Sequence, residues 1–422
     1  MASPLKEHRR VLAASMVGTA VEFYDFYVYA TAAALVFGPL FFPAQSTAAQ
    51  QLLSFMSFGL AFVARPVGAI AFGHFGDRLG RKSTLVASLL LMGVSTLLIA
   101  FLPTFAMVGW VAPLLLCVLR FGQGFGLGGE WGGATLLAFE NAPKGWESRF
   151  GSAPQLGAPV GFLTANGLFL LLGLGLSDRQ FAEWGWRVPF LLSALLVGIG
   201  LWVRLRIGET PAYRAARELE PPPRVPLGVV LRHHWAPTLA AGAGVVSAFS
   251  IFYLSTAFAL SHMTAVRGVS RETMLALQLA ANLFLALGIV LAAIGSDRVS
   301  ARRMLAWGAA ATVDLGLVFG PALAGGSLML VFATLAAALL VMGFVYGPLG
   351  GWMPTLFPVT VRYTGMSVAF NGGGIIGGAV APIAAQMLSA AGGTSLVGLF
   401  LCAAGALTLL GVIAGRPARA AT

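Results

Sequence analysis

Charged residues are scarce in this sequence: 26 of the 422 residues are Lys or Arg, and 15 are Asp or Glu. A soluble domain carries about 25% charged residues, so a chain with 10% charged and 58% hydrophobic residues cannot cover a water-facing surface. Cysteine is nearly missing as well. Cys117 and Cys402 lie in apolar runs, without the spacing of metal ligands. The composition excludes an ordinary soluble protein and predicts a surface that faces lipid.

The short alternating strands of a transmembrane β-barrel are also lacking, because the apolar runs are long and unbroken. A membrane-spanning helix needs about 20 apolar residues. We therefore expect an all-α polytopic membrane protein with twelve transmembrane helices in two pseudo-symmetric six-helix bundles. The apolar runs lie at 11–42, 50–73, 83–102, 106–140, 150–175, 186–206, 236–263, 271–294, 303–322, 327–356, 363–389 and 394–415.

The formal net charge of +11 is explained by the membrane topology and does not indicate a nucleic-acid partner. If the N-terminus is inside, twenty Lys and Arg residues fall in inner segments and four, Arg179, Arg187, Arg267 and Arg271, fall in outer ones. By the positive-inside rule, this distribution predicts cytoplasmic N- and C-termini and no nucleic-acid partner. The first ten residues are polar and basic, and the apolar run that follows is too long for a cleavable signal peptide.

The long polar stretch at 207–235 divides the chain, with six predicted spans on each side. The two sides resemble each other: Gly76–Lys82 is matched 220 residues later by Ser296–Arg303, and 129–131 is matched by 350–352 at an offset of 221. Such a repeat is typical of alternating-access transporters, whose site lies between the halves. We predict a six-helix bundle at 1–206, a cytoplasmic linker at 207–235 and a second six-helix bundle at 236–422.

The motif Gly76–Lys82 (GDRLGRK) resembles the signature loop of the major facilitator superfamily. Further segments resemble its metabolite:proton symporter branch, and the resemblance covers essentially the whole chain. These segments are Val21–Phe26, Ala64–Gly68, Arg120–Gly133, Gly208–Tyr213 and Leu356–Gly365.

The resemblance implies a symporter of the bacterial inner membrane. Members of this branch take up small polar metabolites such as 2-oxoglutarate, citrate, shikimate, aromatic acids, proline or glycine betaine. The proton gradient would supply the energy, without a cofactor or metal. We expect the protein to work as a monomer.

Ionisable residues inside a span are costly, so each of them is a candidate for function. Glu22 and Asp25 are three residues apart and share one helix face, and two close carboxylates in a low dielectric do not both ionise easily. We predict that Glu22, Asp25 and Glu130 carry the coupled proton. The alternative is that they form structural ion pairs, Asp25 with Arg120 and Glu130 with Arg65.

Arg120 is predicted to anchor the substrate, because its planar guanidinium suits a carboxylate. Gln123 lies on the same stripe of its span, and Tyr29 lies on the stripe of Glu22 and Asp25. A permanent salt bridge of Arg120 to a carboxylate is an equal alternative. The two interpretations merge if the substrate and Asp25 compete for one guanidinium, since protonating the acid would then free Arg120.

Uncharged polar residues in the spans supply further substrate-binding candidates, although hydrogen bonds between helices would explain such residues equally well. The candidates are Gln155, Asn166, Tyr253, Gln278, Asn282 and Asn371.

The loop motifs predict ion pairs that latch the cytoplasmic side. Asp77 is expected to interact with helix N-termini and with Arg149, while Glu140, Arg149 and Arg362 are expected to form a parallel latch. The gating candidates are Asp77, Arg78, Arg81, Glu140, Arg149, Asp297 and Arg362.

We therefore expect proton-coupled uptake of a small polar metabolite by alternating access. A proton-coupled exporter of drugs or metabolites on the same scaffold is the alternative. An intramembrane enzyme is not expected, because the sequence offers no nucleophile–base pair and no metal-ligand spacing.

Overall fold

The protein is an all-helical bundle, seen here in a computed structural model that describes residues 9–44, 46–79, 81–128, 130–206 and 226–418. The first half contains α2 (Arg9–Ala32), η1 (Ala33–Phe37), α3 (Gly38–Phe41), α4 (Thr47–Leu79), α5 (Arg81–Ile99), α6 (Phe105–Val108), α7 (Val111–Leu127), α8 (Glu130–Glu140), α9 (Glu147–Gly151), η2 (Pro154–Leu156), α10 (Gly157–Gly175), α11 (Asp178–Glu183), η3 (Gly185–Arg187) and α12 (Val188–Arg206).

The second half follows with α14 (Pro226–His233), α15 (Trp235–Tyr253), η4 (Leu254–Phe258), α16 (Ala259–Ala265), α17 (Arg271–Arg298), α18 (Ala301–Ala324), α19 (Leu328–Trp352), η5 (Met353–Leu356), η6 (Val359–Val361), α20 (Arg362–Gly374), η7 (Ile375–Val380), α21 (Ala381–Gly392) and α22 (Thr394–Ala414).

The expected membrane-spanning helices are present. Within the described residues, eleven helical stretches are long and apolar enough to cross a bilayer, and the remaining predicted span is α5, whose described apolar part is Val86–Ile99. Several helices extend beyond their predicted runs, notably α4 and α17. Of the predicted linker, 207–225 lies outside the described residues, and 226–233 forms α14.

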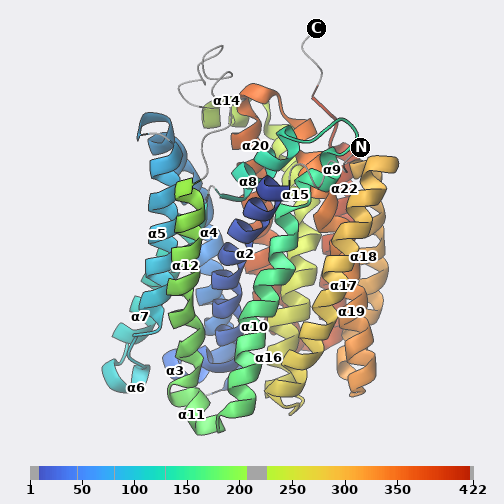
Figure 1. The fold of residues 1–422 in the computed structure, drawn as a ribbon. Helices are drawn as coiled ribbons and strands as arrows, with labels where there is room; N and C mark the ends of the chain where they lie inside the picture. Colours follow the sequence, from blue (N-terminus) through green and yellow to red (C-terminus); the bar gives the residue numbers. More distant parts are fainter. Residues whose placement is uncertain (1–8, 45, 80, 129, 207–225, 419–422) are drawn as a thin grey trace.

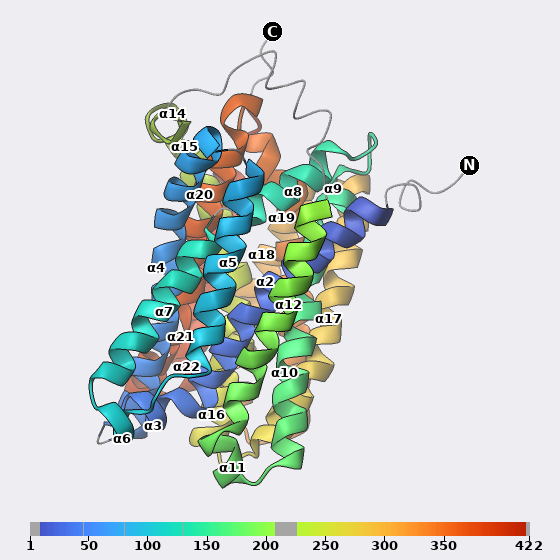
Figure 2. The ribbon, with the colours of Figure 1, turned by 60° about the vertical axis from the view of Figure 1, so that its left-hand side comes forward.

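The helices run side by side between two ends of the bundle (Figure 1). The beginning of α2, the end of α22, α9 and α14 lie at one end, which we call the linker end. The opposite end carries α3, α11 and α16, and we call it the α11 end (Figures 1 and 2). The helices thus span the molecule from end to end, as transmembrane helices must.

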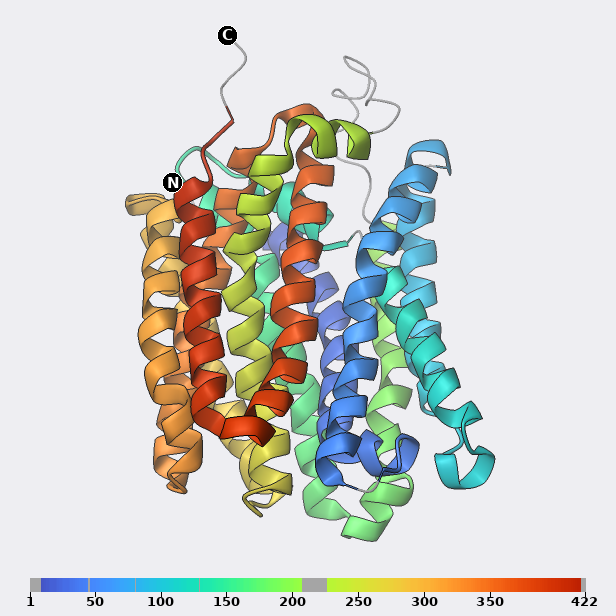
Figure 3. The ribbon, with the colours of Figure 1, turned by 180° about the vertical axis from the view of Figure 1, so that it is seen from behind.

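The two halves lie side by side and pack against each other along the length of the bundle (Figure 3). α10 packs against α17, α4 against α20, η7 and α21, and α9 against α19. Small residues permit this close approach, as they do between membrane helices in general. A Cβ atom on Gly350 would lie 2.2 Å from the Gly151 carbonyl oxygen, so the backbones of α9 and α19 touch across the interface.

Candidate functional site

A small cavity lies between the halves, bordered by α2 and α10 on one side and by α15 and α19 on the other. It offers about 10 Å³ to the centres of water molecules, which is room for about one water. The halves are therefore closely packed around it. Its walls are mainly aromatic: Phe23, Tyr27, Ala158, Ala248, Phe249, Phe252, Tyr253, Met342 and Tyr346.

Asp25 is completely buried inside the first half and is not among the residues that line this cavity. Ser193 of α12 donates a hydrogen bond of 2.5 Å to its Oδ1, and Thr96 of α5 donates one of 3.2 Å to its Oδ2. Donors to a carboxylate stabilise its charged form. Three helices of the first half thus converge on this carboxyl group.

Gln123 connects Asp25 to Arg120. Its Nε2 donates to the Asp25 backbone oxygen (3.1 Å) and to Thr96 Oγ1 (2.8 Å), while its Oε1 accepts from Arg120 Nη1. Side chains in one buried hydrogen-bond network influence each other more strongly than exposed ones do. The network therefore links the predicted proton carrier to the predicted substrate anchor.

The Arg120 guanidinium is fully buried and lies on aromatic rings. Its Cζ is 4.0 Å from the centre of the Tyr29 ring and 4.2 Å from that of Phe26. Its Nε donates to the Phe58 carbonyl oxygen over 3.3 Å, and its Nη2 has no hydrogen-bond partner among the described residues. Cation–π contacts hold such a group in place, and the free donor leaves Arg120 able to bind one more acceptor.

Glu22 and Asp25 share a helix, but their surroundings differ. Glu22 is 7% exposed and interacts electrostatically with Arg65 and with Tyr346 of the second half. Arg65 lies over the rings of Phe26, Phe62 and Phe370, with its Cζ at 5.4, 5.6 and 5.9 Å from their centres. Glu22 therefore faces the interface between the halves, whereas Asp25 lies within the first half.

Three of the predicted polar candidates join the halves. Gln155 Nε2 donates to the Tyr346 carbonyl oxygen (3.0 Å), Asn282 Nδ2 to that of Pro159 (2.9 Å) and Asn371 Nδ2 to that of Gly128 (2.9 Å). Gln155 Oε1 also accepts from Trp131 Nε1. These amides form hydrogen bonds between helices in the closed arrangement.

The other polar candidates lie within one half or at the cavity. Asn166 accepts from Thr31 and donates to the Phe162 carbonyl oxygen, so both ends of its amide are used. Gln278 donates to two carbonyl oxygens of η4. Tyr29 forms a hydrogen bond of 2.9 Å with Ser57. Tyr253 is the member of this group that lines the cavity.

Ion pairs join the halves at the linker end, and the partner of Arg149 differs from the expected latch. Arg149 Nε lies 3.0 Å from Asp297 Oδ2, and the Ser148 backbone N–H donates to Asp297 Oδ1. Arg362 lies 3.9 Å from Glu140. The prediction that Glu140 pairs with Arg149 is thus wrong, because the packing of α9 against α17 brings Arg149 to the charge on the other half instead.

Four predicted residues cannot be placed in this network. The side chains of Asp77, Arg78, Arg81 and Glu130 lie outside the described part of the structure. Their assignments to gating and to proton coupling remain predictions.

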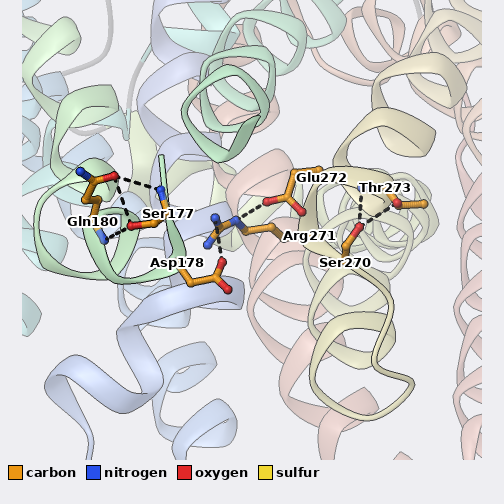
Figure 4. A network of polar contacts seen from close by, with 7 residues as sticks. All are labelled: Ser177, Asp178, Gln180, Ser270, Arg271, Glu272 and Thr273. Carbon is orange, nitrogen blue, oxygen red and sulfur yellow. Dashed lines mark hydrogen bonds and ion pairs between the residues drawn. The ribbon is translucent and has the colours of Figure 1, made fainter. Parts of the chain in front are cut away.

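A contact at the α11 end also joins the halves. Arg271 of α17 lies 3.0 Å from Asp178 of α11 and 2.5 Å from Glu272 (Figure 4). Its guanidinium carbon also lies 4.0 Å from the centre of the Phe181 ring. The described residues therefore hold the halves together at both ends of the bundle.

Sequence reasoning missed several of these residues. Arg271 was counted only as an outer charge, and Ser193 and Thr96 are single hydroxyls in apolar runs without a periodic signal. Tyr27 and Tyr346 of the cavity were likewise not named. Contacts between distant segments define their roles, and those contacts leave no local pattern.

Comparison with known proteins identifies the family. Residues 11–220 match the family described as sugar (and other) transporter. The chain is 45% identical over 416 residues to the inner membrane metabolite transport protein YhjE of Escherichia coli strain K12. The aligned region covers 97% of this chain and 94% of that protein. The chain belongs to the major facilitator superfamily. The resemblance predicted from the motifs is confirmed.

Other relatives in the superfamily carry more specific names. The chain is 37% identical over 414 residues to the shikimate transporter of the same bacterium (96% of this chain, 94% of that protein). It is 27% identical over 431 residues to the proline/betaine transporter of Salmonella typhimurium (98% and 85%). This member of the superfamily is accordingly a membrane transporter of metabolites and not an enzyme.

Solved structures support the superfamily fold. The crystal structure of a D-xylose-proton symporter superposes with a TM-score of 0.72 at 16% identity, covering 96% of each chain. The proton:xylose symporter XylE bound to 6-bromo-6-deoxy-D-glucose gives a TM-score of 0.76 at 15% identity, covering 96% of this chain and 94% of that one. At this identity the likeness confirms the twelve-helix architecture alone.

Proposed function

We propose that this transporter couples the inward movement of protons to the uptake of a small polar metabolite, an organic acid or a zwitterion such as proline or betaine. The observation that carries the proposal is the buried chain of hydrogen bonds from the Asp25 carboxylate through Thr96 and Gln123 to Arg120. It connects an acid that can hold a proton to a cation with a free donor. The names of the relatives that carry shikimate and proline/betaine support this substrate range.

Coupling would follow from competition inside this network. When Asp25 is ionised, its charge and the bridge through Thr96 and Gln123 hold the Arg120 guanidinium in place. Protonation removes the charge, so Arg120 is freer to bind a substrate carboxylate. A ligand that binds one state of the network more tightly shifts the protein toward that state, which links proton binding to substrate binding.

The location, orientation and energy source of the transporter are also proposals. We place the protein in the bacterial inner membrane as a monomer, with the linker end in the cytoplasm and the proton gradient as the energy source. The excess of Lys and Arg in the predicted inner segments and the inner-membrane relative support this placement. Labelling the variants Lys144→Cys and Val266→Cys, both at exposed positions, with an impermeant maleimide in intact cells tests the orientation. The cysteine introduced by Val266→Cys should react, and the one introduced by Lys144→Cys should not.

Reconstituted vesicles containing a pH-sensitive dye test the coupling. Shikimate, 2-oxoglutarate, citrate, proline and glycine betaine are added outside one at a time, and a transported solute should acidify the interior. Asp25→Asn should abolish accumulation driven by a pH gradient while leaving exchange of solute across the membrane. Arg120→Lys should weaken both, because an ammonium lacks the planar fork. Accumulation at the wild-type rate in both variants would contradict the proposal.

The same assay separates symport from the exporter alternative. An antiporter exchanges the solute for protons, so adding solute outside would make the interior alkaline. The sign of the pH change therefore decides between the two directions without knowledge of the stoichiometry.

A further inference from the structure

Two π-helical segments occupy equivalent positions in the two halves. η1 (Ala33–Phe37) continues α2, and η4 (Leu254–Phe258) continues α15, 221 residues later. This offset equals that between 129–131 and 350–352 in the sequence repeat. The two segments contact each other, and η1 also contacts α16. They therefore lie where the first helix of each half approaches the α11 end. π-helical segments inside α-helices are rare and frequently mark functional sites.

A π segment interrupts the regular hydrogen-bond ladder of an α-helix, so the carbonyl groups around it need other donors. In the first half, the neighbouring helix α4 supplies them. Ser54 Oγ donates to the Ala33 carbonyl oxygen over 2.7 Å, and Gln51 Nε2 donates to that of Ala34 over 3.3 Å. Both donors are buried.

The second half uses the same arrangement. Gln278 Nε2, on the neighbouring helix α17, donates to the carbonyl oxygens of Ser255 (3.0 Å) and Thr256 (2.8 Å). Ser255 follows Ala34 by 221 residues, so a glutamine on the second long helix of each half binds the carbonyl group at the matching position. The glutamines come from different places in the sequence repeat, yet they serve equivalent carbonyl groups.

The π register has a geometric consequence. An α-helix turns by about 100° per residue, so closing a π segment into α register would rotate everything beyond it by about that angle. Beyond η1 and η4 lie α3 and α16, which help form the α11 end. Phe37, at the end of η1, packs on Tyr29 and Trp186 with ring centres 5.0 and 5.5 Å away. Such a rotation would break these contacts.

We propose that Gln278 in one half, and Gln51 with Ser54 in the other, are positioning residues for the transport cycle. They hold η1 and η4 in register and so fix the faces with which α3 and α16 close the α11 end. Gln278 is 1% exposed and uses its Nε2 on two carbonyl oxygens of η4, so the role proposed for it is exerted through η4. The proposal rests on the fold and stands whichever solute or ion is carried.

Distances between spin labels test the proposal in the purified full-length protein without a ligand. One label pair, at Arg179→Cys and Val266→Cys, spans the halves at the α11 end, where both side chains are exposed. The test variants are Gln278→Met, Gln51→Met and Ser54→Ala. Thr394→Val is the matched control, because its buried hydroxyl also binds a carbonyl on another helix, that of Gly320, and neither residue belongs to a π segment.

We expect Gln278→Met and Gln51→Met to change the ratio of closed to open distance populations roughly fivefold per lost bond, since one hydrogen bond corresponds to a factor of about 2 to 13. Amide hydrogen exchange should speed up at 254–259 in Gln278→Met and at 33–38 in Gln51→Met and Ser54→Ala. Thr394→Val should change neither quantity.

Wild-type distances and exchange rates in Gln278→Met would overturn the proposal, as would equal shifts in Thr394→Val. If Gln278→Met fails to fold, Ser54→Ala tests the proposal for η1, because it removes a single hydroxyl group. Wild-type spin-label distances and wild-type hydrogen exchange at 33–38 in Ser54→Ala would then overturn the proposal.

Discussion

Arg149 and Asp297 form an ion pair between the two halves at the linker end, with 3.0 Å between Arg149 Nε and Asp297 Oδ2. Asp297 is the second-half counterpart of Asp77 in the repeated motif. The Asp297 side chain is 3% exposed and that of Arg149 24% exposed, so water screens this pair less than it screens a surface pair. The contact belongs to the closed state of this end and must break when the end opens.

Arg149→Gln or Asp297→Asn should therefore favour opening of the linker end. We expect a shift of roughly tenfold in the population ratio, the equivalent of about 1.4 kcal/mol. Spin labels at Lys144→Cys and Val299→Cys, on opposite halves, measure it. Glu183→Gln, which removes an exposed pair within α11, is the control and should have no effect. Partial restoration by the charge swap Arg149→Asp with Asp297→Arg would strengthen the assignment.

Loss of Arg271 should open the other end of the bundle. Arg271→Gln removes the contact between α17 and α11 and should open the α11 end, which the label pair at Arg179 and Val266 reports. Asp178→Asn should do much less, because the Asp178 side chain is 97% exposed and exposed ion pairs contribute little. Equal effects of the two substitutions would show that the ion pair itself, rather than the packing of Arg271 on Phe181, holds this end.

Gly350→Ala should prevent full closure at the linker end. The added Cβ would lie 2.2 Å from the Gly151 carbonyl oxygen, and a backbone group cannot rotate out of the way as a side chain can. We expect the maximal transport rate to fall at least tenfold, with a small change in the apparent affinity. Gly372→Ala is the matched control, because a Cβ there meets nothing within 4 Å. Normal transport by Gly350→Ala would mean that α9 and α19 never approach this closely in the cycle.

Asn166→Ala should lower stability without changing solute affinity. Both ends of the Asn166 amide are used inside the first half, by Thr31 and by the Phe162 carbonyl group, and each lost hydrogen bond costs about 0.5–1.5 kcal/mol. Thermal unfolding in detergent and the solute concentration at half-maximal uptake separate the two effects. A raised half-maximal concentration with unchanged stability would instead place Asn166 in the substrate site.

Arg120 and Asp25 show how far a sequence can lead toward the site. A charged residue in an apolar run is visible at once, because burying it is costly, and both residues prove to be completely buried. The helical stripe on span four predicted that Gln123 lies beside Arg120, but the link from Gln123 to Asp25 was not predicted. Thr96 and Ser193 could not be found this way, because a hydroxyl group in a span is common and costs little.

For the amides and the ion pairs, in contrast, the sequence did not predict the partners. Gln155, Asn282 and Asn371 looked alike in the sequence, and the structure gives each a carbonyl partner on the other half. Arg149 was expected to pair with Glu140 and lies against Asp297 instead, because several Asp and Glu residues flank the spans at that end and the packing of α9 on α17 selects Asp297. Partner choice depends on tertiary contacts between residues up to 243 positions apart.

The sequence by itself determined the class of protein, the helices and the division into two halves. Helices that cross lipid require long apolar runs, and the repeated motifs can be recognised in the sequence. Tertiary structure decided which charges meet, which ends of the bundle are held shut and where helices leave the α register. These features depend on the distances between side chains of different helices. No local pattern carries that information, and the contact of Arg149 with Asp297 is one instance of it.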